Sequence, residues 1–387
     1  MKNTRLTFLF FLCLGLWFTA CKDDRNNSQF VQLGAIYNLG GTQSDLDIPS
    51  SKGAMLAVKQ LNAAGGVLGR TVELLLEDGN TDTMTIRQKV EKILKEAPAV
   101  AAFLGLSDTD MALAAAPPAK SANRVFLTSG ATSPQLPGQV PDYLYLACFG
   151  DNVQAAAAAE WAYNLLNART AAVLFDSLDT YTVLLHQYFV DRFQSLGGSV
   201  AAVQGYDPDN TGQFGQGLPT TDIVFLSAAI VDRIAPLVRQ LRQQGITSPV
   251  IGGDGYDSET GWAANADIAD VYYTTHAYLG ADNSNTAIQN FRAAYSAEYS
   301  GSQPDAFAAL GYDAVMLLAD AIERAGSANP NSVRNALAVT NNFQGLTGTI
   351  TYEAGKQIPR KSVSIIEVKN GKVSLKEDIL PTMVPDP

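Results

Sequence analysis

Short apolar runs alternate along the chain with segments whose apolar residues recur at helical spacing. The runs at residues 31–36, 72–76 and 100–104 are short enough to be buried strands. The segments 53–64 and 83–96 between them have the pattern of helices that bury one face. Because strands alternate with helices, the pattern predicts an α/β fold with parallel sheets covered by helices on both faces.

The same alternation starts again after Gly150. It predicts helices at 153–167, 182–196, 232–244, 286–299 and 307–324, and strands at 171–175, 200–204, 223–226, 250–251 and 271–275. The C-terminal part is β-rich, with strands at 348–352 and 363–368 and a turn signal at Lys369-Asn370-Gly371-Lys372. In a chain of 387 residues, this repetition predicts two α/β lobes.

Polar side chains follow two predicted strands in the first half of the chain. Asp108 and Thr109 come after the strand at 100–104, and Thr132 follows a strand at 125–128. In an open parallel sheet, ligands bind at the carboxyl ends of strands, and a helix N-terminus there attracts anions. The pattern therefore predicts a small carboxylate held between Thr109 and Thr132. Ordinary helix capping is the simpler interpretation of this stretch taken alone.

The composition narrows the classes of function. The net charge of −11 argues against nucleic acids and anionic membrane surfaces as partners. Only two histidines occur, His186 and His276, so a histidine-based metal site is not expected. The sequence contains no dinucleotide-binding glycine motif, phosphate-binding loop, metalloprotease motif or nucleophile signature. We therefore expect no metal, no cofactor and no enzymatic activity.

The first residues have the pattern of a secretory signal. Lys2 and Arg5 precede an uncharged apolar run at residues 6–18, which is too short to span a membrane comfortably. We therefore expect a signal peptide over residues 1–20 and a periplasmic or cell-surface location for the mature protein.

A candidate lipid attachment site follows the signal. Thr19-Ala20-Cys21 resembles a bacterial lipobox, which implies lipidation of Cys21, although Phe18 stands where leucine is usual. Residues 21–29 would then form a lipidated tether, and the lipid would be the only membrane attachment. Cleavage near Ala20 without lipidation is the alternative. With Cys21 lipidated, Cys148 is the only thiol left, so no intrachain disulfide is expected and Cys148 is expected to be buried.

Short motifs occur in a definite order over residues 30–375: NAAGGVLGR at 62–70, LAAAP at 113–117, SGATSP at 129–134, DTY at 179–181, LRQQG at 241–245, GGDG at 252–255, ALGYDA at 309–314 and FQGLTG at 343–348. In their order and spacing they resemble the type I periplasmic binding proteins of the leucine/isoleucine/valine-binding branch. The resemblance covers nearly all of the mature chain.

The resemblance implies two Rossmann-like lobes with parallel sheets, joined by three crossovers. Lobe 1 would comprise residues 30–149 and 277–362, and lobe 2 residues 150–276 and 363–378. The implied function is that of the extracytoplasmic substrate-binding component of an ABC importer. Such a protein captures a small amino acid or related carboxylate or amide by hinge closure and delivers it to a permease in the inner membrane. A receptor domain that reports to a signalling partner is the alternative.

The resemblance also implies a binding site. Thr109 and Thr132 would hold the ligand carboxylate, while the Gly130 carbonyl and the Asp254 carboxylate would bind the α-ammonium. Aromatic side chains would line the cleft, at Tyr181 and Phe307. Taken without the resemblance, Asp254 could instead be a helix N-cap, and the two aromatic residues could be plain core.

The sequence departs from this branch at several positions. Leu46 and Ala229 stand where leucine-binding members have tyrosines, and Thr81 and Asp108 replace the two cysteines of an early disulfide. The side-chain pocket is therefore altered. Because Leu46 and Ala229 leave more room than tyrosines would, we expect an apolar or aromatic amino acid as the ligand.

Overall fold

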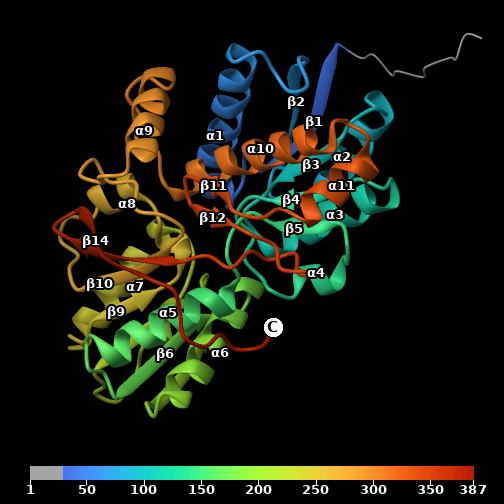
Figure 1. Ribbon diagram of the computed structural model, residues 1–387. Coiled ribbons are helices and arrows are strands. Elements are labelled where there is room, and N and C mark those ends of the chain that lie inside the picture. Colours follow the sequence, from blue (N-terminus) through green and yellow to red (C-terminus); the bar gives the residue numbers. More distant parts are fainter. Residues whose placement is uncertain (1–28) are drawn as a thin grey trace, which may run out of the picture.

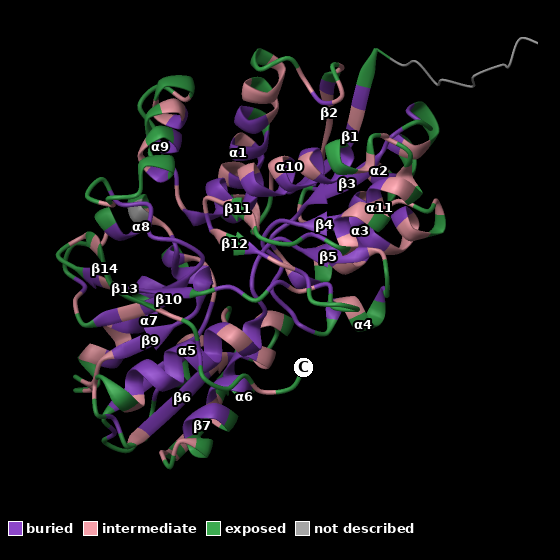
Figure 2. Cartoon of the chain, viewed as in Figure 1, coloured by how far each residue is buried: buried purple, intermediate pink, exposed green. Residues whose placement is uncertain are grey.

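The computed structural model describes residues 29–387 (Figure 1) and contains two α/β lobes, each built on its own sheet. Lobe 1 has a five-stranded sheet in the order β2-β1-β3-β4-β5, in which all neighbouring strands are parallel. Its strands are β1 (Phe30–Tyr37), β2 (Thr71–Asp78), β3 (Ala102–Gly105), β4 (Phe126–Thr128) and β5 (Leu144–Leu146). The central strands are buried on both faces (Figure 2), as expected for a parallel sheet covered by helices.

Lobe 1 also contains helices from two parts of the chain, most of which pack on this sheet. They are α1 (Ser44–Ala63), α2 (Thr83–Glu96), α3 (Thr109–Ser121), α4 (Leu136–Gln139), α9 (Thr286–Glu298), α10 (Ala306–Ala325) and α11 (Pro330–Ala338). The hairpin of β11 (Phe343–Gly345) and β12 (Gly348–Ile350) follows α11. Helices α1 and α10 pack unusually closely. A Cβ atom added to Gly53 would lie 1.8 Å from the Ala308 carbonyl oxygen, and one added to Gly311 would lie 1.9 Å from that of Ser50. Only glycine permits this approach.

Lobe 2 has a seven-stranded sheet in the order β14-β13-β10-β9-β8-β6-β7. Its strands are β6 (Thr170–Asp176), β7 (Ser199–Tyr206), β8 (Ile223–Ser227), β9 (Val250–Gly252), β10 (Val271–Thr275), β13 (Val363–Lys369) and β14 (Lys372–Ile379). The pairs β10–β13 and β13–β14 are antiparallel, and the other pairs in this sheet are parallel. The lobe also contains α5 (Asp151–Asn164), α6 (Thr180–Ser195), α7 (Val231–Gln243), α8 (Glu259–Ala263) and the 3₁₀ turns η1 (Thr211–Gln213) and η2 (Asp254–Tyr256).

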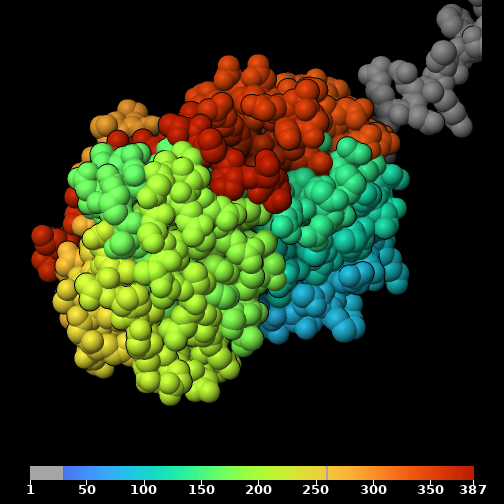
Figure 3. All heavy atoms as spheres, turned by 90° about the horizontal axis from the view of Figure 1, so that it is seen from below, coloured from blue at the N-terminus to red at the C-terminus, as the bar shows by residue number. Residues whose placement is uncertain are grey.

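The chain passes between the lobes at three places: between β5 and α5, between β10 and α9, and between β12 and β13. The exact lobe boundaries given above stay a prediction. The last residues return to α5 and α6 of lobe 2, where the Thr382 N–H donates to Glu160 and the Asn152 amide donates to the Pro385 carbonyl at 2.8 Å. In Figure 3 this C-terminal segment (red) lies where the two lobes meet.

The predicted α/β elements are present, with informative differences. Helix α1 begins at Ser44, not at residue 53 as predicted. The first turns of the helix were missed because their buried face contains Asp47 and Ser50 as well as Leu46, so the apolar periodicity is not visible there. Helix α11 was not predicted. The turn between β13 and β14 is confirmed, since Asn370 and Gly371 have φ angles of 55° and 72°.

Within residues 29–387, we find no helix with the length and apolar character needed to cross a membrane. The signal peptide, Cys21 and the tether up to residue 28 lie outside the described residues.

Candidate ligand-binding site between the lobes

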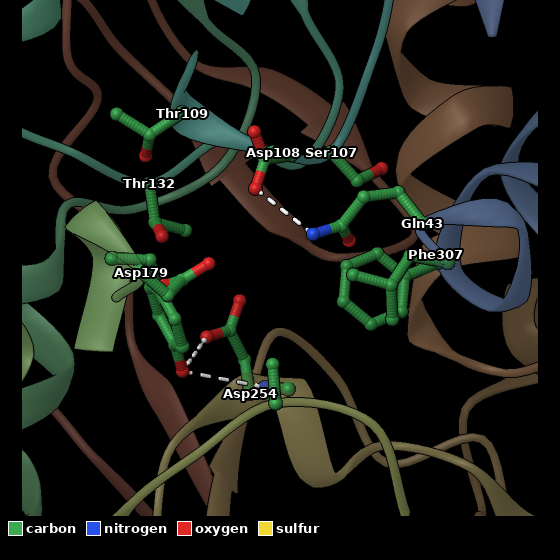
Figure 4. A pocket seen from close by; sticks show the side chains of 12 residues that line it. Gln43, Ser107, Asp108, Thr109, Thr132, Asp179, Asp254 and Phe307 are labelled. Carbon is green, nitrogen blue, oxygen red and sulfur yellow. Dashed lines mark hydrogen bonds between the residues drawn. The ribbon is translucent and has the colours of Figure 1, made fainter. Parts of the chain in front are cut away.

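A small cavity lies between the two lobes. Its lobe 1 wall follows β1, β3 and β4, and its lobe 2 wall follows β6, β8 and β9, so both walls are built from the carboxyl ends of parallel strands. The lining residues, drawn in Figure 4, are Gln43, Leu46, Ser107, Asp108, Thr109, Thr132, Asp179, Tyr181, Ala229, Asp254, Gly255 and Phe307. Five of the six predicted binding residues are therefore brought together: Thr109, Thr132, Tyr181, Asp254 and Phe307.

The lobe 1 wall presents hydroxyl groups at the start of α3. Asp108 is the N-cap of this helix, because its carboxylate accepts the Met111 N–H at 3.0 Å. Thr109 is therefore not needed as a cap. The residue is only 5% exposed, yet its hydroxyl has no hydrogen-bond partner among residues 29–387. A buried hydroxyl without a partner costs free energy unless a ligand satisfies it.

The sixth predicted residue, Gly130, does not line the cavity. A Cβ atom added to Gly130 would lie 2.9 Å from the Ser107 Oγ and 3.2 Å from Phe307, so this glycine lies directly behind the lobe 1 wall. Phe307 itself belongs to the core of lobe 1 and also lines the cavity, so both interpretations of this residue hold. The carbonyl role of Gly130 stays a prediction.

The lobe 2 wall holds a carboxylate in a dense hydrogen-bond network. The Asp254 Oδ1 accepts the Tyr181 hydroxyl at 2.9 Å and the Gln154 amide at 2.8 Å, and its Oδ2 lies 3.0 Å from the His276 Nε2. The N-cap alternative for Asp254 is wrong, because Ser258 caps α8 by accepting the Gly261 N–H at 3.1 Å. Asp254 is thus free to serve a ligand, with its side chain fixed in position.

Gln154 organises this network from α5. Its amide oxygen accepts the Asp254 N–H at 3.0 Å and the Thr274 hydroxyl at 2.7 Å, while its amide nitrogen also donates to Asp151 at 2.9 Å. Burial, reinforced by the negative charge of Asp254, raises the pKa of Asp151 well above its usual range. Burial beside the Asp254 carboxylate therefore favours the neutral form of Asp151.

His276 supports Asp254 without neutralising it. Its ring is buried and stacks on Phe149 with a centroid distance of 3.8 Å. Burial lowers the pKa of His276 despite the hydrogen bond to Asp254. A neutral imidazole that donates through Nε2 leaves the carboxylate charge available. Sequence reasoning missed this role because it considered the histidines only as metal ligands.

Two non-glycine residues beside the cavity have left-handed backbone. Leu106, next to Ser107, has a φ of 58°, and Ile230, next to Ala229, has a φ of 70°. Hydrogen bonds hold both: the Thr128 hydroxyl donates to the Leu106 carbonyl at 2.8 Å, and the Ile230 N–H donates to the Gly255 carbonyl at 2.9 Å. Such strain persists only where the surroundings fix it, and it concentrates at ligand sites.

Sequence reasoning also missed part of the lining. Gln43 precedes α1 and was overlooked because that helix was expected to start later. Asp108 and Asp179 are the N-caps of α3 and α6, and the capping signal hid their second position on the cavity wall.

The prediction for Cys148 is confirmed: it is fully buried, its thiol donates to the Ala131 carbonyl at 3.2 Å, and burial raises its pKa.

The fold and the cavity define a class of protein: a two-lobed α/β protein with a polar cavity between its lobes. Comparisons with known proteins then identify the family. Residues 31–372 match the family model described as periplasmic binding protein, and the chain belongs to this family. Its fold is that of the type I periplasmic binding proteins, as predicted.

Relatives and solved structures agree over most of the chain. The Leu/Ile/Val-binding protein homolog 3 of Brucella melitensis is 25% identical over 352 residues, which cover 89% of this chain and 92% of that protein. The leucine binding protein LivK of Thermotoga maritima superimposes with a TM-score of 0.80 and 29% identity, covering 91% of this chain and 99% of that one. LivJ of Streptococcus pneumoniae, in complex with isoleucine, gives a TM-score of 0.81 and 25% identity, covering 91% and 100%. These relatives are binding proteins, not enzymes.

Proposed function

We propose that this protein is the extracytoplasmic substrate-binding component of an ABC importer and that its cavity holds a small amino acid or related carboxylate or amide. The observation that carries the proposal is that two groups line one cavity: the buried Thr109 hydroxyl on lobe 1, which has no partner among residues 29–387, and the Asp254 carboxylate on lobe 2. A zwitterion satisfies both walls at once: its carboxylate meets hydroxyls and free N–H groups of α3, and its ammonium meets Asp254.

Binding would be coupled to closure of the lobes. Groups from both lobes line one cavity, and the Thr180 hydroxyl of lobe 2 donates to Asp110 of lobe 1 at 3.1 Å beside it. The three chain crossings act as the hinge in this proposal, so the ligand enters when the lobes separate and is enclosed when they close. The isoleucine in the LivJ structure supports an amino acid as the ligand class.

A melting screen tests the ligand class. Ligand at a hundred times its dissociation constant should stabilise the fold by about 2.7 kcal/mol, which is visible as a rise in melting temperature. The screen compares L-amino acids with matched acids that lack the amine and amides that lack the carboxylate. We expect a shift only with compounds that carry both groups. Equal shifts with simple organic acids would replace the amino-acid proposal with a carboxylate receptor.

We also propose lipidation of Cys21, on the basis of Thr19-Ala20-Cys21. The test is cell fractionation of the wild type and of Cys21→Ser. The wild type should be found with membranes and the variant in the soluble extracytoplasmic fraction. A wild type that is never membrane-associated would favour signal cleavage without lipid.

A further inference from the structure

The cavity wall is acidic beyond what a zwitterion needs. Three carboxylates line it, those of Asp108, Asp179 and Asp254, and no lysine, arginine or histidine is among the lining residues. Figure 4 shows the three carboxylates around one open space. A zwitterion brings one positive and one negative charge. The ammonium would pair with Asp254, and the ligand carboxylate would leave the complex no more positive than the empty cavity. Asp108 and Asp179 accept N–H groups as the N-caps of α3 and α6, but no cationic side chain in the lining pairs with them.

Gln43 adds an acceptor to the same side of the cavity. Its amide nitrogen donates to the Asp108 Oδ2 at 3.0 Å, while its amide oxygen is buried and has no hydrogen-bond partner within the described residues. In this orientation the amide gives the Asp108 carboxylate a donor, as an ionised carboxylate requires. The Gln43 amide oxygen is therefore a hydrogen-bond acceptor that a donor on a ligand can satisfy.

We infer that this end of the cavity accepts a positively charged, donor-rich side chain, and that the ligand is a basic amino acid with a guanidinium or ammonium side chain. This inference rests on the proposed function and replaces the expectation of an apolar side chain. Leu46 and Phe307 provide the apolar surface along which the methylene stem of such a side chain can lie. Asp108, Asp179 and the Gln43 oxygen would receive its N–H groups.

The electrostatics of the empty cavity agree with this assignment. Burial, together with the charges of Asp179, Asp110 and Asp47, raises the pKa of Asp108 to about 7. The neighbouring donors are the Gln43 amide and the Met111 N–H. A cation in the cavity favours the ionised form of Asp108, so affinity for a basic amino acid should increase as pH rises from 6 to 8. Affinity for a neutral amino acid should not follow this trend.

Isothermal titration calorimetry with isosteric ligand pairs tests the inference. L-Arginine is compared with L-citrulline, and L-lysine with L-norleucine, in wild type, Asp108→Asn and Asp179→Asn. Asparagine is itself a good N-cap, so both helices should keep their starts. The matched control is Asp82→Asn, the same change at the exposed N-cap of α2, outside the cavity.

We expect a basic ligand to bind the wild type at least about tenfold more tightly than its neutral isostere. Asp108→Asn should weaken the basic ligand by about ten- to a hundredfold and the neutral one by less than about threefold. Asp179→Asn should act in the same direction, and Asp82→Asn should change neither. Binding of leucine or citrulline as tight as that of arginine would overturn this inference and leave the proposed function standing. Failure of every amino acid to bind would overturn both.

Discussion

The two walls of the cavity differ in how many hydrogen bonds from the protein hold the polar side chain that lines them. On lobe 2, Asp254 is fixed by Tyr181, Gln154 and His276, which come from α6, α5 and the segment after β10. On lobe 1, Thr109 lines the same space with a buried hydroxyl that has no partner in residues 29–387. The side chain that lines the cavity on lobe 2 is therefore held by three other side chains, whereas the Thr109 hydroxyl on lobe 1 is held by none of the described residues.

This difference assigns separate tasks to the walls. A charge that is already oriented needs no rearrangement when an ammonium arrives, so it contributes strongly to affinity. An unsatisfied hydroxyl slightly destabilises the empty closed form and is satisfied only by ligand, so it favours closure around ligand over closure without it. Mutations on the two walls should therefore separate effects on affinity from effects on stability.

The largest expected effect is on affinity at Asp254. Asp254→Asn keeps the shape of the side chain but removes the charge proposed to meet the ammonium. The loss should be about 2–5 kcal/mol, or roughly thirty- to several-thousand-fold in dissociation constant. Calorimetric titration measures it. The control is Asp267→Asn, which removes an exposed carboxylate paired with Arg239 on the same lobe and should leave binding unchanged. A loss below about threefold at Asp254 would contradict its assigned role.

The hydrogen bonds around Asp254 should also contribute to the free energy of unfolding of the ligand-free protein. Gln154→Leu leaves the Asp254 N–H and the Thr274 hydroxyl without their acceptor in a buried site. The free energy of unfolding should fall by about 2–3 kcal/mol. Denaturant unfolding of the ligand-free protein checks this. An unchanged midpoint would mean that the network is not formed in the empty protein.

Removing the Thr109 hydroxyl should have the opposite effect on stability. Thr109→Val removes the hydroxyl, so affinity should fall by about 1.5–3 kcal/mol, while the stability of the empty protein should stay the same or rise. Thr221→Val is the matched control, because the Thr221 hydroxyl is buried and donates to the Ile223 carbonyl at 2.8 Å, away from the cavity. That variant should lose about 1 kcal/mol of stability and no affinity. A clear loss of stability in Thr109→Val would show that its hydroxyl has a protein partner.

The smallest effect concerns pH and the buried Asp47 behind the lobe 1 wall. Burial raises the pKa of Asp47 from 3.8 to about 7 in the folded protein. The folded state thus binds this proton more tightly than the unfolded chain, so its contribution to stability is present in acid and is lost as pH rises through about 7. Between pH 6 and 8 the loss should be about 1 kcal/mol. Unfolding curves at both pH values should show a smaller decrease in Asp47→Asn than in the wild type.

The sequence predicted the parts of this protein whose signals are local. Apolar runs and helical periodicity were sufficient for most strands of the two sheets, although not for β5 and β14. The polar residues after β3 and β4 led to Thr109 and Thr132. The start of α1 was missed because close packing against α10 uses Gly53 and polar residues rather than apolar ones.

The supporting residues of the site carry no such local signal. Gln154 and His276 meet Asp254 across sequence separations of 100 and 22 residues, and no pattern in either segment marks the contact. Asp108 and Asp179 were visible only as caps, since their convergence on one cavity depends on how the two lobes face each other. Long-range juxtaposition of this kind needs the structure.

The central claim is that Asp254 recognises the α-ammonium of an amino acid held between the lobes. The direct test measures, by calorimetry, the affinities of the tightest-binding amino acid and of its counterpart without the α-amine, in wild type and in Asp254→Asn. We predict that the wild type prefers the amino acid by at least about thirtyfold and that this preference falls to within about threefold in the variant. Equal binding of the two compounds to the wild type, or an undiminished preference in Asp254→Asn, would contradict the account.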